Sequence, residues 1–222
     1  MTTIIIGILL SILIIGFLNL KAKYDSHLKK LEFANEFRNH FVNLANHYLQ
    51  SYDSWSRQGN IDHNNYNWLT KNVDQMQANL GGIGIINYVA PFGRFHSTNY
   101  QVLINTISKF REKIHQTEIN LCDDCLTRYI GIYEKIIISN KKELKNPFLW
   151  FKEGINFLLI LPFNILKWFG LMNSKTVKQI TNNLVYKIFT GLVALIAFIS
   201  SIVTIIQGKE ATIGFIKAVV EK

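Results

Sequence analysis

Two polar stretches of the chain combine aromatic rings with basic and amide side chains. They are YLQSYDSWSRQGNIDHNNYNW at 48–68 and GGIGIINYVAPFGRFHSTNY at 81–100. Rings of this kind stack on nucleobases, and nearby cations attract the phosphates of a single strand. The predicted ligand-binding residues are Trp55, Arg57, His63, Tyr66, Phe92, Arg94, Phe95 and His96.

Both stretches also have an interpretation without a ligand. A long loop inside a compact domain is usually functional, but most aromatic rings are buried. The rings of 81–100 would then pack on their own helices. Residues 48–68 would be a solvated connection, with a turn at Gly59-Asn60 and a helix start near Asp62. The glycines of 81–100 lack the GxGxxG spacing of a dinucleotide site.

Cys122 and Cys125 form the one CxxC sequence of the chain. A structural zinc site needs two further ligands at suitable spacing, and the sequence has no second CxxC and no HxxxH. Residues three apart share one face of a helix, so we expect two buried thiols. No nucleophile elbow, phosphate-binding loop or carboxylate cluster is present. The sequence therefore predicts no enzyme activity, no metal site and no cofactor.

Two stretches are apolar enough to cross a membrane. Residues 4–20 and 188–206 carry no charge and are 17 and 19 residues long. That length nearly matches a hydrocarbon layer of about 30 Å. The first could instead be a cleaved signal peptide, but it lacks a basic start and a small-residue cleavage site. We predict an uncleaved N-terminal and a C-terminal transmembrane helix.

The orientation follows from the lysines. Lys21 and Lys23 come directly after the first stretch, and Lys178 and Lys187 precede the second. The positive-inside rule then predicts that residues 21–187 are cytoplasmic and that both termini lie outside, in a chain anchored in a bacterial inner membrane. Of the net charge of +9, more than half lies after residue 146, which is typical of attraction to anionic lipid headgroups.

The stretch LWFKEGINFLLILPFNILKWF at 149–169 is apolar but carries charges near both ends. Its uncharged centre is too short to cross a membrane, and we expect Pro162 to break it. An interfacial or re-entrant amphipathic segment is the leading interpretation, and a third crossing or a soluble core are the alternatives. The predicted membrane-interface residues are Trp150, Lys152, Lys167 and Trp168.

Small residues follow one face of the last apolar stretch with a spacing of three and four. Such stripes let membrane helices approach closely, and they can also line a pore in an oligomer. Packing alone and pore lining both stay open. The candidate pore-lining residues are Thr190, Ala194, Ala197, Ser201 and Thr204.

The fold class predicted is mainly α, without a sheet. Apolar spacing predicts a helix from 24 to 52 that continues the first span, a helix at 66–80 that stops at Gly81-Gly82, and helices at 103–114 and 121–136. The domains expected are an N-terminal transmembrane helix (1–23), a helical cytoplasmic domain (24–146), an interfacial segment (147–183), and a C-terminal transmembrane helix with its tail (184–222).

Three motifs carry a resemblance that extends over most of the chain: NYNWLTKNVDQMQANLG, YVAPFGRF and NPFLWFKEGINFLLILPFNILKWFGLM. With the glycine- and serine-bearing last span, they resemble small bacterial membrane effectors of anti-phage defence, such as the effector of Hailong systems. The resemblance implies a homo-oligomeric ion channel whose cytoplasmic domain binds a DNA oligomer made by a partner nucleotidyltransferase. A non-conducting membrane scaffold that docks a cytoplasmic protein is the alternative function. A peripheral protein that perturbs lipids without a pore is a third.

Overall fold

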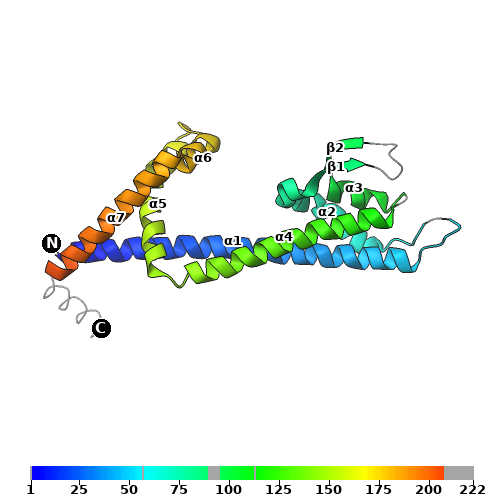
Figure 1. The fold of residues 1–222 in the computed structure, drawn as a ribbon, viewed down its shortest axis with the longest axis horizontal. Coiled ribbons are helices and arrows are strands. Elements are labelled where there is room, and N and C mark those ends of the chain that lie inside the picture. The colour runs from blue at the N-terminus through cyan, green and yellow to red at the C-terminus, as the bar shows by residue number, and fades with distance from the viewer. Residues whose placement is uncertain (1, 57, 90–95, 113, 208–222) are drawn as a thin grey trace. The chain divides into compact units, whose positions relative to one another are not determined.

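The computed structural model describes residues 2–56, 58–89, 96–112 and 114–207. This part of the chain is mainly helical, as the sequence predicts (Figure 1). It divides into two compact units. We call residues 26–138 the core unit, and residues 1–25 with 139–222 the apolar unit.

Helix α1 spans Thr2–Gln50 without interruption, which confirms that the first apolar stretch continues into the amphipathic helix. In the core unit its inward face repeats by four, three and four, and it buries Phe37, Phe41, Leu44 and Tyr48. This spacing keeps one stripe of a 3.6-residue helix on the core. The other face of α1 stays polar.

Helix α2 spans His63–Leu80 and also matches its prediction. The carboxylate of Asp62 accepts hydrogen bonds from the backbone N–H groups of Asn64 and Asn65, which caps the helix start. The helix ends at Gly81, whose φ of 52° suits a residue without a Cβ.

A two-stranded antiparallel sheet corrects the prediction that the chain has none. A 3₁₀ turn at Gly81–Gly84 leads into β1 (Ile85–Val89), and β2 (His96–Gln101) pairs with it. The register shifts between Ile86 and Tyr88, and Asn99 has a positive φ of 57°. These irregularities break the period-two alternation by which a strand is recognised in a sequence.

Helices α3 (Val102–Lys109) and α4 (Gln116–Glu143) complete the core unit. Their predicted centres were correct, but α3 is shorter and α4 longer than expected. Leu103, Ile107, Leu126 and Tyr129 join α1 and α2 in one buried cluster. An ion pair between Arg38 and Asp123 sets α1 against α4.

The apolar unit contains the start of α1, helix α5 (Pro147–Trp168), helix α6 (Ser174–Asn182) and helix α7 (Leu184–Gln207). The side chain of Asn146 caps α5, and Pro147 occupies its first turn, where no N–H is needed. Pro162 lies inside α5 without ending it, so the predicted break is wrong. Proline is tolerated within apolar helices whose neighbours or local adjustments satisfy the freed carbonyl.

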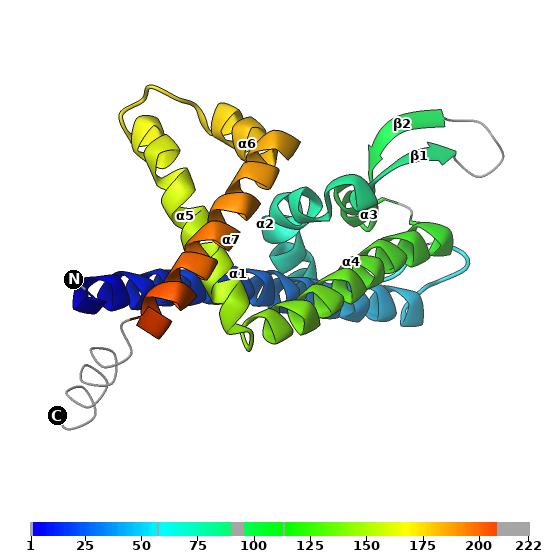
Figure 2. The same cartoon turned by 60° about the vertical axis from the view of Figure 1, so that its left-hand side comes forward.

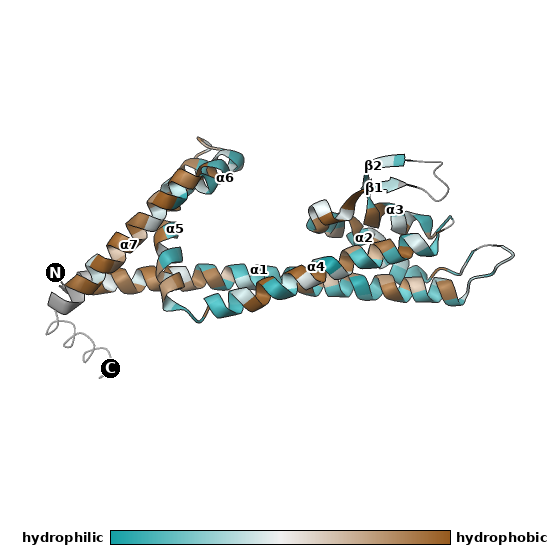
Figure 3. Ribbon diagram, viewed as in Figure 1, coloured by the Kyte–Doolittle hydropathy of each residue, from teal (hydrophilic) through white to brown (hydrophobic). Residues whose placement is uncertain are grey.

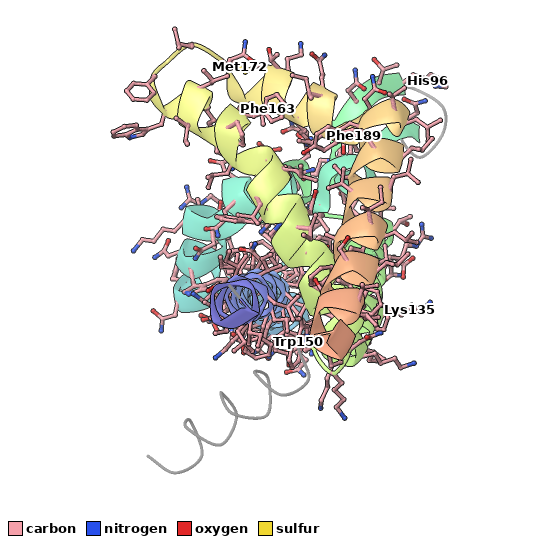
Figure 4. The ribbon with its side chains drawn as sticks, turned by 90° about the vertical axis from the view of Figure 1, so that its left-hand side faces the viewer. His96, Lys135, Trp150, Phe163, Met172 and Phe189 are labelled. Carbon is pink, nitrogen blue, oxygen red and sulfur yellow. The ribbon has the colours of Figure 1, made fainter. Side chains whose placement is uncertain are left out.

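Helices α5 and α7 cross each other (Figure 2), and ring pairs connect them toward both ends of α5. The ring centroids of Phe148 and Phe198 are 4.4 Å apart, and those of Phe163 and Tyr186 are 6.2 Å apart. Phe163 and Trp150 lie toward opposite ends of α5 (Figure 4). Large aliphatic side chains on the outer face of α7 stay exposed, among them Leu195, Ile196 and Ile199.

Helix α5 crosses α1 where two glycines remove the side chains. A Cβ on Gly154 would lie 2.1 Å from the carbonyl oxygen of Ile12, and a Cβ on Gly16 would lie 1.7 Å from that of Trp150. Phe17 and Trp150 pack edge to face beside this crossing, with ring centroids 5.0 Å apart. Close backbone approach at glycine is typical of helix pairs in membranes.

In the described part of the chain, three helices are long and apolar enough to cross a membrane: α1 near the N-terminus, α5 and α7. The ribbon in Figure 3, coloured by hydropathy, shows that hydrophobic residues predominate in α7 and in the first part of α1. With 22 residues, α5 meets the length that its uncharged centre alone does not reach. The chain thus has the composition of a membrane protein, and α5 qualifies as a third crossing by length.

Candidate functional site

Trp55 is held outward in a fixed turn between α1 and α2. Its side chain is 95% exposed, which is extreme for the largest apolar residue. The carboxylate of Asp53 accepts hydrogen bonds from the backbone N–H groups of Trp55 and Ser56, at 3.1 and 2.9 Å. Hydrogen bonding from Ser56, and then from the N–H of Trp55, holds the pKa of Asp53 below its usual value. The turn therefore holds the backbone at Trp55, which lowers the entropy cost of ordering this segment on binding.

Further hydrogen bonds fasten this turn to the rest of the core unit. The backbone N–H of Asp53 donates to the carbonyl of Gln58, whose side-chain amide donates to the carbonyl of Glu112. The N–H of Asn60 donates to the hydroxyl of Ser51 at 2.7 Å. The bond to Glu112 ties the turn to the α3–α4 connection.

The other predicted ligand-binding residues are scattered. His63 is exposed at the start of α2, and His96 is exposed at the start of β2, opposite Val89. The structure corrects the prediction that Tyr66 binds a ligand. Tyr66 is only 5% exposed in the core, so its ring has no free face on which a base could stack. The guanidinium of Arg111 covers its ring at 4.6 Å from the centroid. Arg57, Phe92, Arg94 and Phe95 lie outside the described residues.

The sequence did not reveal a buried charge network at the base of the hairpin. The carboxylate of Glu118 accepts hydrogen bonds from the ammonium of Lys109, from the hydroxyl of Tyr88 at 3.0 Å and from the backbone N–H of His115 at 3.3 Å. Glu118 is the third residue of α4, so the last bond is half of a capping box. Its partner position holds His115 instead of serine or threonine, and that removed the usual sequence signal.

Tyr88 and Tyr100 stack at 4.5 Å between centroids, and the Lys109 ammonium lies 5.4 and 5.6 Å from their rings. Burial raises the pKa of both tyrosines. Burial lowers the pKa of Lys109, but its interactions with Glu118 and Tyr100 outweigh that effect and leave the pKa raised. The network joins β1, β2, α3 and α4 and is structural, because its charges face one another instead of a ligand.

Cys122 and Cys125 are both buried free thiols on α4, as predicted. Burial raises the pKa of both, and for Cys122 the rise is large. The Cys125 thiol lies 3.5 Å from the carbonyl of Ile83. Among the described residues, no three His, Cys, Asp or Glu side chains are grouped so that they could hold a metal ion.

A polar groove of about 470 Å³ lies between α5, α6 and the start of α7. Hydrophobic packing does not explain this groove. The groove brings together two residues predicted for different roles, Lys152 at the membrane interface and Thr190 in a pore. Its lining consists of Lys152, Glu153, Asn156, Ile160, Thr181, Asn182, Tyr186, Lys187, Thr190 and Gly191.

The small-residue stripe of α7 lies on its half-buried side. Thr190, Ala194, Ala197 and Ser201 share this face with Tyr186 and Phe198, whose rings contact α5. The hydroxyls of Thr190 and Ser201 donate to carbonyls of their own helix. Within one chain the stripe therefore serves packing, except where Thr190 opens into the groove. The side chain of Thr204 lies outside the described residues.

The predicted interface residues lie at both ends of α5. The indole N–H of Trp150 donates to the carbonyl of Leu144 at 3.1 Å, which fixes the ring at the start of the helix. At the other end Trp168 is 82% exposed and packs against Phe169. Lys167 precedes it in the last turn. Aromatic and basic residues at both ends are typical of a helix that meets lipid headgroups.

Comparisons of the chain with known protein families, with curated proteins and with solved structures find no match.

Proposed function

We propose that the chain is an oligomeric membrane effector that conducts ions and is gated by a ligand bound to its core unit. The proposed setting is the inner membrane of a bacterium, in defence against phage. The core unit would be cytoplasmic, and its ligand a nucleotide or a single-stranded DNA oligomer supplied by a partner nucleotidyltransferase. This proposal follows the resemblance of the sequence to effectors of that kind.

The polar groove between α5 and α7 is the observation that carries the conduction proposal. Both helices are apolar enough to span a membrane, yet each contributes a lysine and further polar groups to one groove. Ionisable residues in such helices are costly and mark ion paths, relays or substrate sites. Three candidate spans cannot enclose a channel alone, so conduction requires several copies around an axis.

The proposal is tested with the purified full chain in liposomes that hold a salt gradient, with a dye that reports membrane potential. We expect ion flux, and we expect Asn156→Leu and Thr190→Leu to reduce it strongly because both place an apolar side chain in the groove. Ile196→Phe is the matched control, since it adds bulk on the exposed face of α7. Absence of flux, or flux that the groove variants leave unchanged, would contradict conduction along this groove.

A membrane scaffold is the second candidate function, and Trp55 is the observation that favours it. Exposed tryptophans held in a fixed geometry are frequent anchors of protein–protein interfaces. A scaffold would show no ion flux in the same liposomes, while Trp55→Ala would abolish the recruitment of a cytoplasmic protein. The two functions therefore separate in one preparation.

A further inference from the structure

The core unit has two surface features of opposite character. One is a groove of about 570 Å³ between α4 and the 81–86 segment, lined by Gly82, Ile83, Ile86, Arg128, Gly131, Ile132 and Lys135. Arg128 and Lys135 are seven residues apart, two turns along one face of α4. Neither forms an ion pair with another described residue. We call this the basic groove.

The other feature is the polar face of α1, which points away from the core. It carries a shallow hollow lined by Glu32, Asn35, Glu36, Asn39, His40 and Asn43. Glu32 and Glu36 form no ion pair with a described residue either. The half-buried Phe33 adjoins them and packs on Trp68. We call this the acidic face.

Contacts inside the core unit place one end of the acidic face at the level of Arg128 in the basic groove. His27 packs on Tyr133, and the Lys30 ammonium lies 5.9 Å from the centre of that ring. Arg38 reaches Asp123. Residues 128–135 of α4 therefore lie beside residues 26–33 of α1, so Glu32 is level with Arg128, and the rest of the acidic face follows further along α1. Glu32 of one copy and Arg128 of the next would then meet at one level in a closed ring.

We infer that the acidic face of one copy docks in the basic groove of the next copy. Glu32 and Glu36 would face Arg128 and Lys135, the asparagine amides would supply hydrogen bonds, and Phe33 would meet the isoleucine floor. The two surfaces differ, so the contact is heterologous and can close into a ring. The inference rests on the proposed oligomer and identifies one interface within it.

Crosslinking of the full chain in detergent tests the contact directly. Cys122→Ser with Cys125→Ser supplies a background without native thiols. On it, Asn35→Cys places a thiol on the acidic face and Gly131→Cys places one in the groove, where a Cβ meets no atom within 4 Å. With an oxidant, we expect dimers and higher covalent oligomers from the double-cysteine chain and none from either single-cysteine chain.

Charge reversal supplies the matched control. Glu32→Lys with Glu36→Lys, or Arg128→Glu with Lys135→Glu, should each lower crosslinking about tenfold, because like charges then face each other. All four changes together should restore it. Crosslinking of a single-cysteine chain would overturn the heterologous contact.

The particle mass in detergent separates this inference from the proposed function. Oligomers without crosslinking at this cysteine pair would overturn the interface and leave the oligomeric effector standing. Monomers under all conditions would overturn both.

Discussion

Arg38 of α1 and Asp123 of α4 form a two-pronged ion pair. The Nε and Nη2 atoms of the guanidinium donate to the two carboxylate oxygens at 2.7 and 2.9 Å. The fork geometry fixes the register of the two helices that run through the core unit. The pair is partly exposed, with 38% and 33% of the two side chains accessible, so its effect on stability is limited by solvent screening.

Arg38→Lys should lose the fork while it keeps the charge. We expect the coupling between residues 38 and 123 to be about 0.5–1 kcal/mol, the range of partly exposed ion pairs. The measurement is a double-mutant cycle with Arg38→Lys and Asp123→Asn, followed by urea unfolding of the full chain in detergent. If all four chains unfolded at the same urea concentration, the ion pair would contribute nothing measurable to stability.

The Lys109–Glu118 network should be far more sensitive. Glu118 is nearly fully buried and serves three donors, so Glu118→Ala leaves a cation, a hydroxyl and a helix-start N–H without their acceptor. We expect a loss of about 2–3 kcal/mol in the free energy of unfolding, since the 30% exposed Lys109 can still reach water. Glu118→Gln, which keeps the shape, should lose less.

The same network predicts a dependence on alkaline pH. The pKa values of Lys109, Tyr88 and Tyr100 are raised in the folded protein. The stability that these groups add to the folded protein is complete below the usual pKa values of 10.0 for tyrosine and 10.5 for lysine. It is lost as the pH rises through the pKa values of the folded protein. Lys109→Met should flatten the fall in melting temperature between pH 9 and pH 11, whereas Lys71→Met on the exposed side of α2 should not.

The glycine crossing of α1 and α5 predicts an asymmetry among glycines of the same helix. Gly16→Ala should destabilise the chain by about 1–3 kcal/mol, the usual cost of overpacking, because its new methyl group would overlap the backbone of Trp150. Gly7→Ala is the control, since a Cβ there meets no atom within 4 Å. The measurement is the melting temperature in detergent. A fall in melting temperature of the same size in both variants would contradict the close crossing of α1 and α5.

The lysine distribution predicts where each segment lies. In a chain without native cysteines, the thiols of Gln58→Cys and Lys175→Cys should be protected from an impermeant maleimide in intact cells, and the thiol of Thr2→Cys should react. Protection of position 175 indicates that α5 lies on or dips into the inner leaflet. Reaction at position 175 with protection at 58 would show instead that α5 crosses, as its length permits.

The features that could be predicted are those that neighbouring residues determine, and the features that were missed depend on residues far apart in the sequence. The periodic stripe of α1, the Asp62 cap and the Gly81 stop are local signals, so α1 and α2 were correct. The hairpin was missed because its strands are short and irregular at Ile86–Tyr88. The predicted break at Pro162 was wrong because the effect of a proline in an apolar helix depends on the neighbouring helices.

The candidate site was less predictable for the same reason. Trp55 is exposed in a turn that Asp53 caps locally, and its role as a ligand contact stays a prediction. Tyr66 is buried in the core cluster, where it meets Arg111, which is 45 residues away in the chain. The polar groove is lined by residues from α5, α6 and α7 together, so the spacing of residues within one helix does not predict it.

Current recordings from the full chain in a planar bilayer, with single-stranded oligonucleotide added to the side of the core unit, test gating most directly. We expect current before addition, a fall on addition and recovery after nuclease treatment. Loss of one stacked ring at ~2 kcal/mol weakens binding about thirtyfold, so Trp55→Ala should shift the required concentration by that factor while Trp55→Phe shifts it less. A current that ignores the oligonucleotide at every concentration, or a bilayer that stays silent, would contradict a ligand-gated channel.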